Sequence, residues 1–494
     1  MGLNGVRSYP LGGGGFILTA CLLTYGECNR FHEEISADPY YMKEEILMKT
    51  RVKIVLPAVL CVFILLGAGV SSALAANAIF DVSKMSDMSD FDANKWANPS
   101  GDTIKIGLMD PFSGPGAGNG EIYFLVATWV AHDLNKRGGI KVDGKMKKIE
   151  LIKGDTLTQP AKTKKEAERL CLEEKVDALH GTTGSHISVV IQSVAEKYKK
   201  IYVNTHALSD VLMNGKNFNR YTFRTLQKAE VHGAALGYFY KHRWEKKFYI
   251  LCQDYTYGHS MAEGFKAALK KYRPDAEIVG EDYHPLFLKD FAPYLTKIQA
   301  SGAEVIYSAD WMPDGGNMIT QARSLGIYLP IANIYMNEPN SLSKVGPRGT
   351  EGMVNAYCWM VPDKDDAAKQ YTKKWNDQWQ KWDKPYNTPL YKWPGGVLGD
   401  AAFGLYWLFS VMERAGTTDP EKVIAQWEGD EFETIWGVKK MRACDHETIQ
   451  DMYVTEYIYP NAYYDDQSSQ GFVFRVPAQF ATPSVAPDLE RCKK

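Results

Sequence analysis

A run of small and hydroxylated residues at 176–190 has the composition of an anion-binding turn. An apolar segment ends there at Gly181, and Gly184 and Ser185 precede a second apolar segment with the character of a helix. The first turn of a helix has N–H groups without internal partners and carries a partial positive charge, so it suits an anion such as a carboxylate. The same pattern is typical of an ordinary helix cap in any α/β protein, and both interpretations are open at this point.

Signatures of catalysis are missing from the sequence. The Gly-rich turns lack both the G-x-G-x-x-G pattern after a strand and the Lys of a phosphate loop. No set of His and acidic residues has metal-binding spacing, and no G-x-S-x-G nucleophile turn is present. These absences argue against an enzyme, and we expect neither a cofactor nor a metal.

Composition narrows the class of protein further. The chain has 494 residues, of which 45% are hydrophobic and 23% charged, as in a globular protein with two or three domains. The formal net charge of -2 gives no indication of nucleic-acid binding. Aromatic residues make up 12% of the chain, and we expect most of them to serve packing.

The N-terminal part has the features of an export signal. Basic residues at 49–53 precede an apolar run at 54–70, and Ala73 and Ala75 are the small residues that signal peptidase prefers. The run is shorter than the roughly 20 apolar residues of a membrane-spanning helix. We expect a signal peptide that begins at Met48 and is cleaved after Ala75, and hence a soluble periplasmic protein.

Residues 1–47 do not fit in front of such a signal, because they combine a glycine run with scattered acids. The Lys-Glu-Glu at 43–45 can be encoded by a purine-rich ribosome-binding sequence shortly before Met48. We hypothesise that this segment is not translated in the cell, and peptide mapping of the precursor that recovers it would contradict the hypothesis. Residues 76–102 form a polar leader to the fold.

Five of the eight cysteines follow the expected cleavage site, and none has the close spacing of a zinc or redox pair. An oxidising compartment permits a disulfide, and our candidate pair is Cys444 with Cys492, which would tie the C-terminal tail to the body. Cys171, Cys252 and Cys358 lie in apolar segments, so we expect buried free thiols there.

Strand and helix patterns alternate in two series, which predicts parallel sheets with helices on both faces. The first series has strands at 103–109, 149–153, 176–181 and 201–203. The second has strands at 248–251, 277–280, 305–307 and 331–333.

The pattern changes after a further apolar segment at 353–358. Helices at 366–381, 399–415 and 420–428 then follow one another without strands. We expect these helices to complete the first unit, and late strands at 435–441 and 452–458 to complete the second.

Several short segments, spread in order over residues 103–460, together form a specific pattern. They are Ile106-Gly107-Leu108 with Phe112-Ser113-Gly114-Pro115, the Asn-Lys-Arg-Gly-Gly-Ile at 135–140, Gly144, Glu150-Leu151, Asp155, the segment 175–178 with Gly181, and the segments 254–258, 321–326 and 441–446. In this order and spacing the chain resembles the extracytoplasmic solute-binding proteins of branched-chain amino acid (Leu/Ile/Val) ABC transporters.

The resemblance implies the type I periplasmic-binding fold. That fold has two Rossmann-like α/β lobes, each a mainly parallel sheet flanked by helices, which a three-strand hinge joins and which close on a ligand. We expect the crossings near Thr225, Val361 and Glu431. The implied boundaries are 103–224 with 362–430 for lobe 1, 225–361 with 431–460 for lobe 2, and 461–494 for a C-terminal tail.

The resemblance also implies ligand-binding residues in lobe 1. Ser185 matches the hydroxyl that grips the ligand carboxylate, and the family's threonine hydroxyl in the next loop falls on Leu208, or on Ser209 with a one-residue shift. His206 either donates to an anion or caps its loop, and Asn119 stands where many relatives have an aromatic ring. The implied set is Phe112, Ser113, Asn119, Gly184, Ser185, His206, Ala207 and Leu208.

In lobe 2 the resemblance places Tyr257 and Trp311 as aromatic walls over the ligand, although both also suit plain packing. Glu338 matches the carboxylate that binds a ligand ammonium, with a solvated loop acid as the alternative. Asp310 and Asp314 are rivals for that role. Two further aromatic residues are expected at the rim, Tyr391 and Trp393.

The function implied is that of a monomeric periplasmic substrate-binding protein for an ABC uptake transporter. It would bind a small amino acid or related carboxylate and deliver it to permease subunits in the inner membrane. Two alternatives are open: a ligand-sensing receptor of a signalling system, and a different ligand such as an amide or an aromatic acid.

Overall fold

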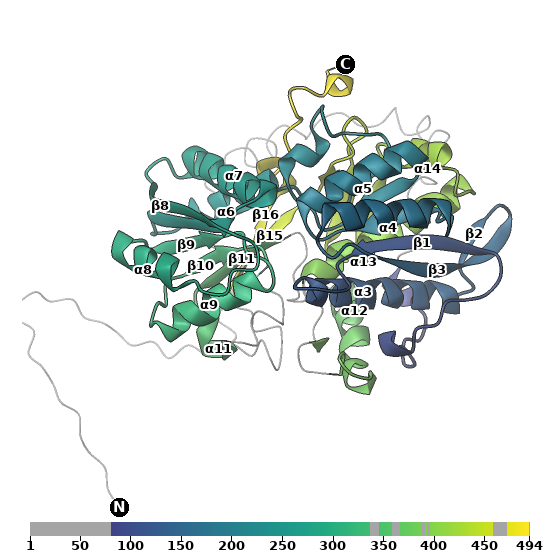
Figure 1. Cartoon of the computed structure of the whole chain (residues 1–494), viewed down its shortest axis with the longest axis horizontal. Coiled ribbons are helices and arrows are strands. Elements are labelled where there is room, and N and C mark those ends of the chain that lie inside the picture. The colour runs from purple at the N-terminus through teal and green to yellow at the C-terminus, as the bar shows by residue number, and fades with distance from the viewer. Residues whose placement is uncertain are drawn as a thin grey trace, which may run out of the picture. The chain divides into compact units, whose positions relative to one another are not determined.

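The computed structural model describes residues 81–335, 345–357, 366–387, 391–392, 396–457 and 472–493. The expected signal peptide, the segment before it and Cys358 lie outside these residues. Within the described part, no helix is long and apolar enough to cross a membrane. The described residues form two large, mainly parallel sheets flanked by helices, together with a small antiparallel sheet (Figure 1).

The first sheet has the strand order β2-β3-β1-β4-β5-β6, in which only β2 is antiparallel to its neighbour. Leu108 on β1 packs in the core beneath α3, whereas the next residue, Met109, packs beneath α4 and α5. This alternation is why the sheet is covered on both faces (Figure 1). The elements are β1 (Thr103–Asp110), α3 (Ala117–Lys136), β2 (Ile140–Val142), β3 (Lys145–Asp155), α4 (Pro160–Leu172), β4 (Ala178–Gly181), α5 (Ser185–Tyr198), β5 (Ile201–Asn204) and β6 (Thr222–Arg224).

The second sheet has the order β16-β15-β11-β10-β9-β7-β8, in which β15 is antiparallel to both of its neighbours, β11 and β16. On β7, Ile250 belongs to the core under α6 and α7, and Leu251 to the core under α8 and α9. The elements are α6 (Ala229–Tyr240), β7 (Lys247–Gln253), α7 (Thr256–Tyr272), β8 (Glu277–His284), α8 (Ala292–Ser301), β9 (Val305–Ser308), α9 (Asp314–Ser324), β10 (Ile331–Asn333), α11 (Gly346–Gly349), β11 (Met353–Tyr357), β15 (Met452–Glu456) and β16 (Phe472–Val476).

The late helices α12 (Asp366–Asn376), α13 (Gly396–Ala415) and α14 (Pro420–Trp427) follow in the chain, and α13 packs on α3 of the first sheet. Of the expected late strands, the one at 452–458 joins the second sheet as β15, whereas the one at 435–441 does not. β12 (Glu431–Thr434), β13 (Gly437–Met441) and β14 (Thr448–Ile449) form a separate antiparallel sheet, in which β12 exposes Glu431 and Glu433 on one face. β16 lies in the segment expected as a tail, yet it forms the edge of the second sheet.

The segments that connect the two large sheets meet beside β6. Arg224 forms a parallel bridge with Glu447, and its N–H donates to the His446 carbonyl at 3.0 Å. The Thr448 hydroxyl donates to the Arg224 carbonyl at 2.7 Å. The expected crossing at Val361 lies outside the described residues.

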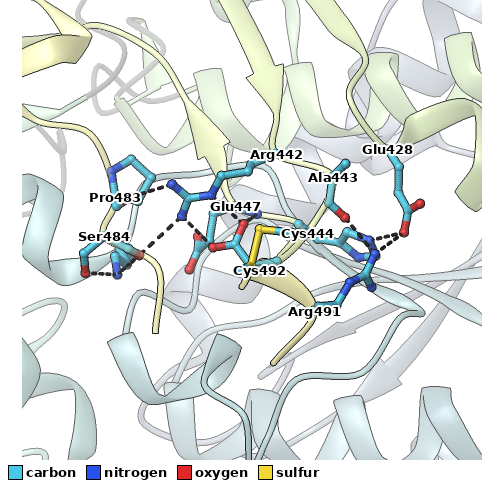
Figure 2. The surroundings of a disulfide bond; sticks show 12 residues. Glu428, Arg442, Ala443, Cys444, Glu447, Pro483, Ser484, Arg491 and Cys492 are labelled. Carbon is cyan, nitrogen blue, oxygen red and sulfur yellow. Dashed lines mark hydrogen bonds and ion pairs between the residues drawn. A yellow bond between two sulfur atoms is a disulfide. The ribbon is translucent and has the colours of Figure 1, made fainter. Parts of the chain in front are cut away.

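A disulfide joins Cys444 to Cys492, the pair singled out from the sequence, with their Cα atoms 5.1 Å apart. Figure 2 shows the surrounding contacts of the C-terminal segment. Arg491 donates to Glu428 at 2.7 Å, and Arg442 donates to the Pro483 carbonyl at 2.7 Å. The tail is therefore fixed to the body by covalent and charged contacts. Two further cysteines are buried and free, Cys171 and Cys252.

Replacing both Cys444 and Cys492 with serine should lower the free energy of unfolding by roughly 2–4 kcal/mol, because an open loop has more conformations in the unfolded chain. The bond spans 48 residues of sequence. Chemical denaturation with and without reductant measures the effect. Reductant should destabilise the wild-type protein and leave the double variant unchanged, and an equal response of both would contradict the prediction.

His232 on α6 is buried, and its Nδ1 lies 3.0 Å from the Ala356 carbonyl on β11. Burial lowers the pKa of His232 to about 4. The neutral ring is favoured in the fold, so its contribution to stability is complete above pH 6.5 and is lost as the pH falls toward 4. With 1.36 kcal/mol per pKa unit, we expect a loss of about 2–3 kcal/mol.

The variant His232→Asn should lack this part of the acid-induced loss, since its amide does not titrate. Urea unfolding at pH 7 and pH 4 measures the difference for both proteins. An identical loss of stability in wild type and variant would show that His232 does not titrate as its burial requires.

Candidate functional site

A cavity lies where loops after the strands of the two large sheets face each other. Its free volume is small, about 20 Å³ on a scale where one water molecule needs roughly 10–15 Å³, so its walls lie close together. Nearly all its residues follow the carboxyl ends of parallel strands, which is where α/β sheets bind ligands. The lining consists of Asn119, Tyr123, Thr183, Gly184, Ser185, His206, Tyr255, Tyr257, Trp311 and Tyr335.

The loop between β4 and α5 presents a helix N-terminus to the cavity. Gly184 caps α5 with φ +93°, and a Cβ there would lie 3.1 Å from the His186 ring, so glycine is required. The Ser185 Oγ accepts a hydrogen bond from the Ser209 N–H at 3.1 Å. This bond uses a lone pair of the oxygen and not its hydrogen, so the Ser185 hydroxyl can still donate a hydrogen bond to a ligand. The loop therefore suits a carboxylate.

Aromatic rings form the opposite wall, and hydrogen bonds hold them in place. The Tyr257 hydroxyl donates to the Ala309 carbonyl at 2.8 Å, and the Trp311 indole N–H donates to the Tyr255 hydroxyl at 2.8 Å. The Phe287 ring packs edge-on against Trp311 with centroids 5.7 Å apart. Fixed rings offer a large apolar contact area at a low cost in rotamer entropy.

Residues after the first-sheet strands also contact residues after the second-sheet strands directly. These contacts hold the two sides of the cavity together, so the space for a ligand between them is small. Hydrogen bonds that make the connection include Asn119 Nδ2 to the Met312 carbonyl at 3.4 Å, the Tyr335 hydroxyl to the His206 carbonyl at 3.4 Å, and Ser209 Oγ with Ser260 Oγ at 2.9 Å.

No Lys, Arg, Asp or Glu side chain lines the cavity among the described residues. Burial lowers the pKa of His206, which does line it, to about 3. A carboxylate would accordingly be held by helix N–H groups and hydroxyls rather than by an opposite side-chain charge.

Several predicted residues do not line the cavity. The backbone N–H of Phe112 and the hydroxyl of Ser113 both donate to the Asp155 carboxylate, which fixes their loop. Ala207 and Leu208 are buried in the protein core. The position expected to match the family's threonine is therefore occupied by the packed side chain of Leu208, which has no hydroxyl. Ser209 was the alternative position for that hydroxyl, and its hydroxyl forms a hydrogen bond with Ser260 instead.

The rival acids are engaged elsewhere. Asp310 is fully buried 2.9 Å from the His284 ring, and Asp314 accepts from the Gln253 amide at 2.8 Å. Tyr391 is buried and packs on Tyr386 with centroids 5.2 Å apart. The other predicted acid and rim residue, Glu338 and Trp393, lie outside the described residues.

Four lining residues were missed by sequence reasoning, although each has a signal nearby. Tyr255 lies in the same five-residue segment as Tyr257, and Tyr123 follows Asn119 by one helical turn. The remaining two are Thr183, next to Gly184, and Tyr335, at the start of the segment that contains Glu338.

Two helix-covered sheets that share a small-molecule cavity at their strand ends define a two-lobed binding protein. The family model described as periplasmic binding protein matches residues 103–461. The chain belongs to this family.

Curated relatives and solved structures agree with this assignment. The Leu/Ile/Val-binding protein homolog 4 of Brucella melitensis is 22% identical over 73% of this chain and 85% of its own, and an amino acid binding protein of Pseudomonas aeruginosa is 24% identical over 72% and 90%. The leucine-, isoleucine-, valine-, threonine- and alanine-binding protein of Brucella ovis, in a closed conformation, has a TM-score of 0.66 at 20% identity and covers 78% of this chain and 98% of its own. A solute-binding protein of Rhodopseudomonas palustris in complex with benzoate has a TM-score of 0.65 at 19% identity over 79% and 100%.

Proposed function

We propose that the protein captures a small amino acid or related carboxylate in the periplasm and delivers it to the permease of an ABC uptake transporter. The observation that carries the proposal is the small cavity with a helix N-terminus on one side and fixed aromatic rings on the other. Membership in the periplasmic binding protein family supports capture and delivery.

The ligand's acid group would bind at Gly184 and Ser185. There it would accept hydrogen bonds from the first-turn N–H groups of α5 and from the Ser185 hydroxyl. The remainder of the ligand would lie against Tyr257 and Trp311. An ammonium on that remainder would be attracted to the ring faces.

An aromatic acid is the second candidate ligand. The lining provides five aromatic side chains and no acidic side chain to pair with an ammonium among the described residues. A relative in fold was solved with benzoate. An aromatic carboxylate would stack against the same walls without needing a buried counter-charge.

A thermal-shift screen tests both candidates, because a ligand that binds only the folded state raises the melting temperature. The compounds are leucine, valine, phenylalanine, benzoate and 4-hydroxybenzoate, each with its amide or methyl ester as a matched control. We expect at least one free acid to stabilise the protein and its neutral derivative to fail. Stabilisation by the derivatives alone would refute recognition of an acid group.

The variant Ser185→Ala should bind the best compound of that screen about 10-fold more weakly, since a hydrogen bond to a charged group is lost. Calorimetric titration measures the affinity. Ser324→Ala is a matched control, because Ser324 donates to the Thr320 carbonyl on α9 and does not line the cavity. Unchanged affinity in Ser185→Ala would remove this residue from the site.

A further inference from the structure

Three polar side chains meet beneath the ligand cavity at the ends of neighbouring strands. Asp110 ends β1, His180 lies on β4, and His206 follows β5, and these strands are adjacent in the sheet order. One carboxylate oxygen and one nitrogen from each imidazole ring all lie within 4.8 Å of one another. All three side chains are buried, and Asp110 is 1% exposed.

Two potential ligand atoms of this cluster have no hydrogen-bond partner in the described structure. Asp110 Oδ1 accepts from the Thr183 N–H at 3.0 Å, whereas Oδ2 is buried without a hydrogen-bond partner in the described structure. His180 Nδ1 is likewise buried without a partner there. An unpaired buried carboxylate is costly, so a cation at this place would remove a substantial penalty.

The charges around the cluster do not supply that cation. The buried Lys439 forms its ion pair with Asp400, at 2.7 Å. His206 Nε2 lies 3.7 Å from Asp110 Oδ2, which is beyond hydrogen-bond distance. No arginine or lysine side chain contacts Asp110 in the described structure.

We propose that Asp110, His180 and His206 bind a divalent transition-metal ion such as Zn²⁺ beneath the ligand cavity. Two histidines and one carboxylate are a common ligand set for such ions. Ligand atoms about 2.1 Å from a tetrahedral ion lie about 3.4 Å apart; His206 Nε2 and Asp110 Oδ2 are 3.7 Å apart, and all three ligand atoms lie within 4.8 Å of one another.

Outer contacts orient these ligands as in known metal sites. The Thr205 hydroxyl lies 2.6 Å from His206 Nδ1, 3.2 Å from His206 Nε2 and 3.4 Å from His180 Nε2, so it contacts both rings. The Thr183 N–H and hydroxyl hold the other Asp110 oxygen. Three protein ligands leave one position for a water or for an oxygen from the cavity that His206 lines.

A second group of potential ligands carries no such inference. Cys444, Asp445 and Cys492 also lie within 4.8 Å of one another, but the two sulfur atoms are joined in the disulfide. The cluster beneath the cavity was not visible in the sequence because its members are 70 and 26 residues apart.

Calorimetric titration of the chelator-treated mature protein with Zn²⁺ tests the proposal, with Co²⁺ absorption as a second readout on the wild type. We expect one ion per chain, and at least about 100-fold weaker binding in Asp110→Asn and in His180→Gln. The control His259→Gln, at an exposed histidine 2.9 Å from Asp254, should bind as the wild type does.

Melting temperatures keep the test informative if a variant is unstable. Asp110→Asn keeps the size of the side chain and removes a metal-binding carboxylate, so Zn²⁺ should raise the melting temperature of the wild type and not that of this variant. The proposal is wrong if the wild type binds neither Zn²⁺ nor Co²⁺, or if only His259→Gln loses the ion. The metal proposal is independent of the class of organic ligand, because the carboxylate screen is done without added metal and the metal titration without added carboxylate.

Discussion

Replacing Trp311 with alanine is expected to weaken ligand binding by roughly 100-fold or more, the range of a central aromatic contact residue. Trp311 is buried, and its indole N–H binds the Tyr255 hydroxyl, so it holds a second ring of the wall. Removing the indole ring would take away contact area with the ligand and the hydrogen bond that holds Tyr255 in place. Trp311→Phe retains a ring and should lose less.

The matched control is Trp244→Ala, because Trp244 is 68% exposed and does not line the cavity. Calorimetric titration with the most stabilising of leucine, benzoate and 4-hydroxybenzoate measures both affinities, after circular dichroism has verified the fold. If Trp311→Ala binds as tightly as Trp244→Ala, the aromatic wall does not hold the ligand.

Arg224→Met is expected to lower the free energy of unfolding by about 3–5 kcal/mol, because Glu447 would keep a buried charge without its partner. Arg224 is fully buried and binds both carboxylate oxygens of Glu447. It also donates to the carbonyls of Ala207 and Ser209 at 3.3 and 2.8 Å. The same side chain therefore stabilises the strand crossing and the loop that carries His206.

The double variant Arg224→Met with Glu447→Gln should recover part of the loss, since no uncompensated charge remains. Lys373→Met is the control, because its ion pair with Asp377 is exposed and is expected to be worth less than about 1 kcal/mol. Urea denaturation compares all three. A loss in Arg224→Met as small as in the control would contradict a structural role for this ion pair.

Local chemistry explains which parts of the site the sequence predicted. The glycines and Ser185 mark a strand end followed by a helix start, and both features depend on neighbouring residues. Tyr257 and Trp311 also follow strand ends, but it was the family resemblance that placed them at the ligand. The two parallel sheets were predictable from the alternation of strands and helices.

Features that depend on distant segments were not predictable in this way. Leu208 turns into the core because its loop is fixed by Arg224, and Asp310 turns away from the cavity toward His284. β16 joins the second sheet by pairing with β15, across a stretch of sequence that shows no strand alternation. Side-chain direction in loops and the pairing of edge strands are set by tertiary contacts.

The crystal structure of the complex with the most stabilising carboxylate of the screen tests the central claim most directly. We predict that its acid group lies within hydrogen-bond distance of the Ser185 hydroxyl and the first-turn N–H groups of α5, with the rest of the molecule between Tyr257 and Trp311. A ligand bound away from Ser185, or oriented with its acid group toward Trp311, would contradict the account.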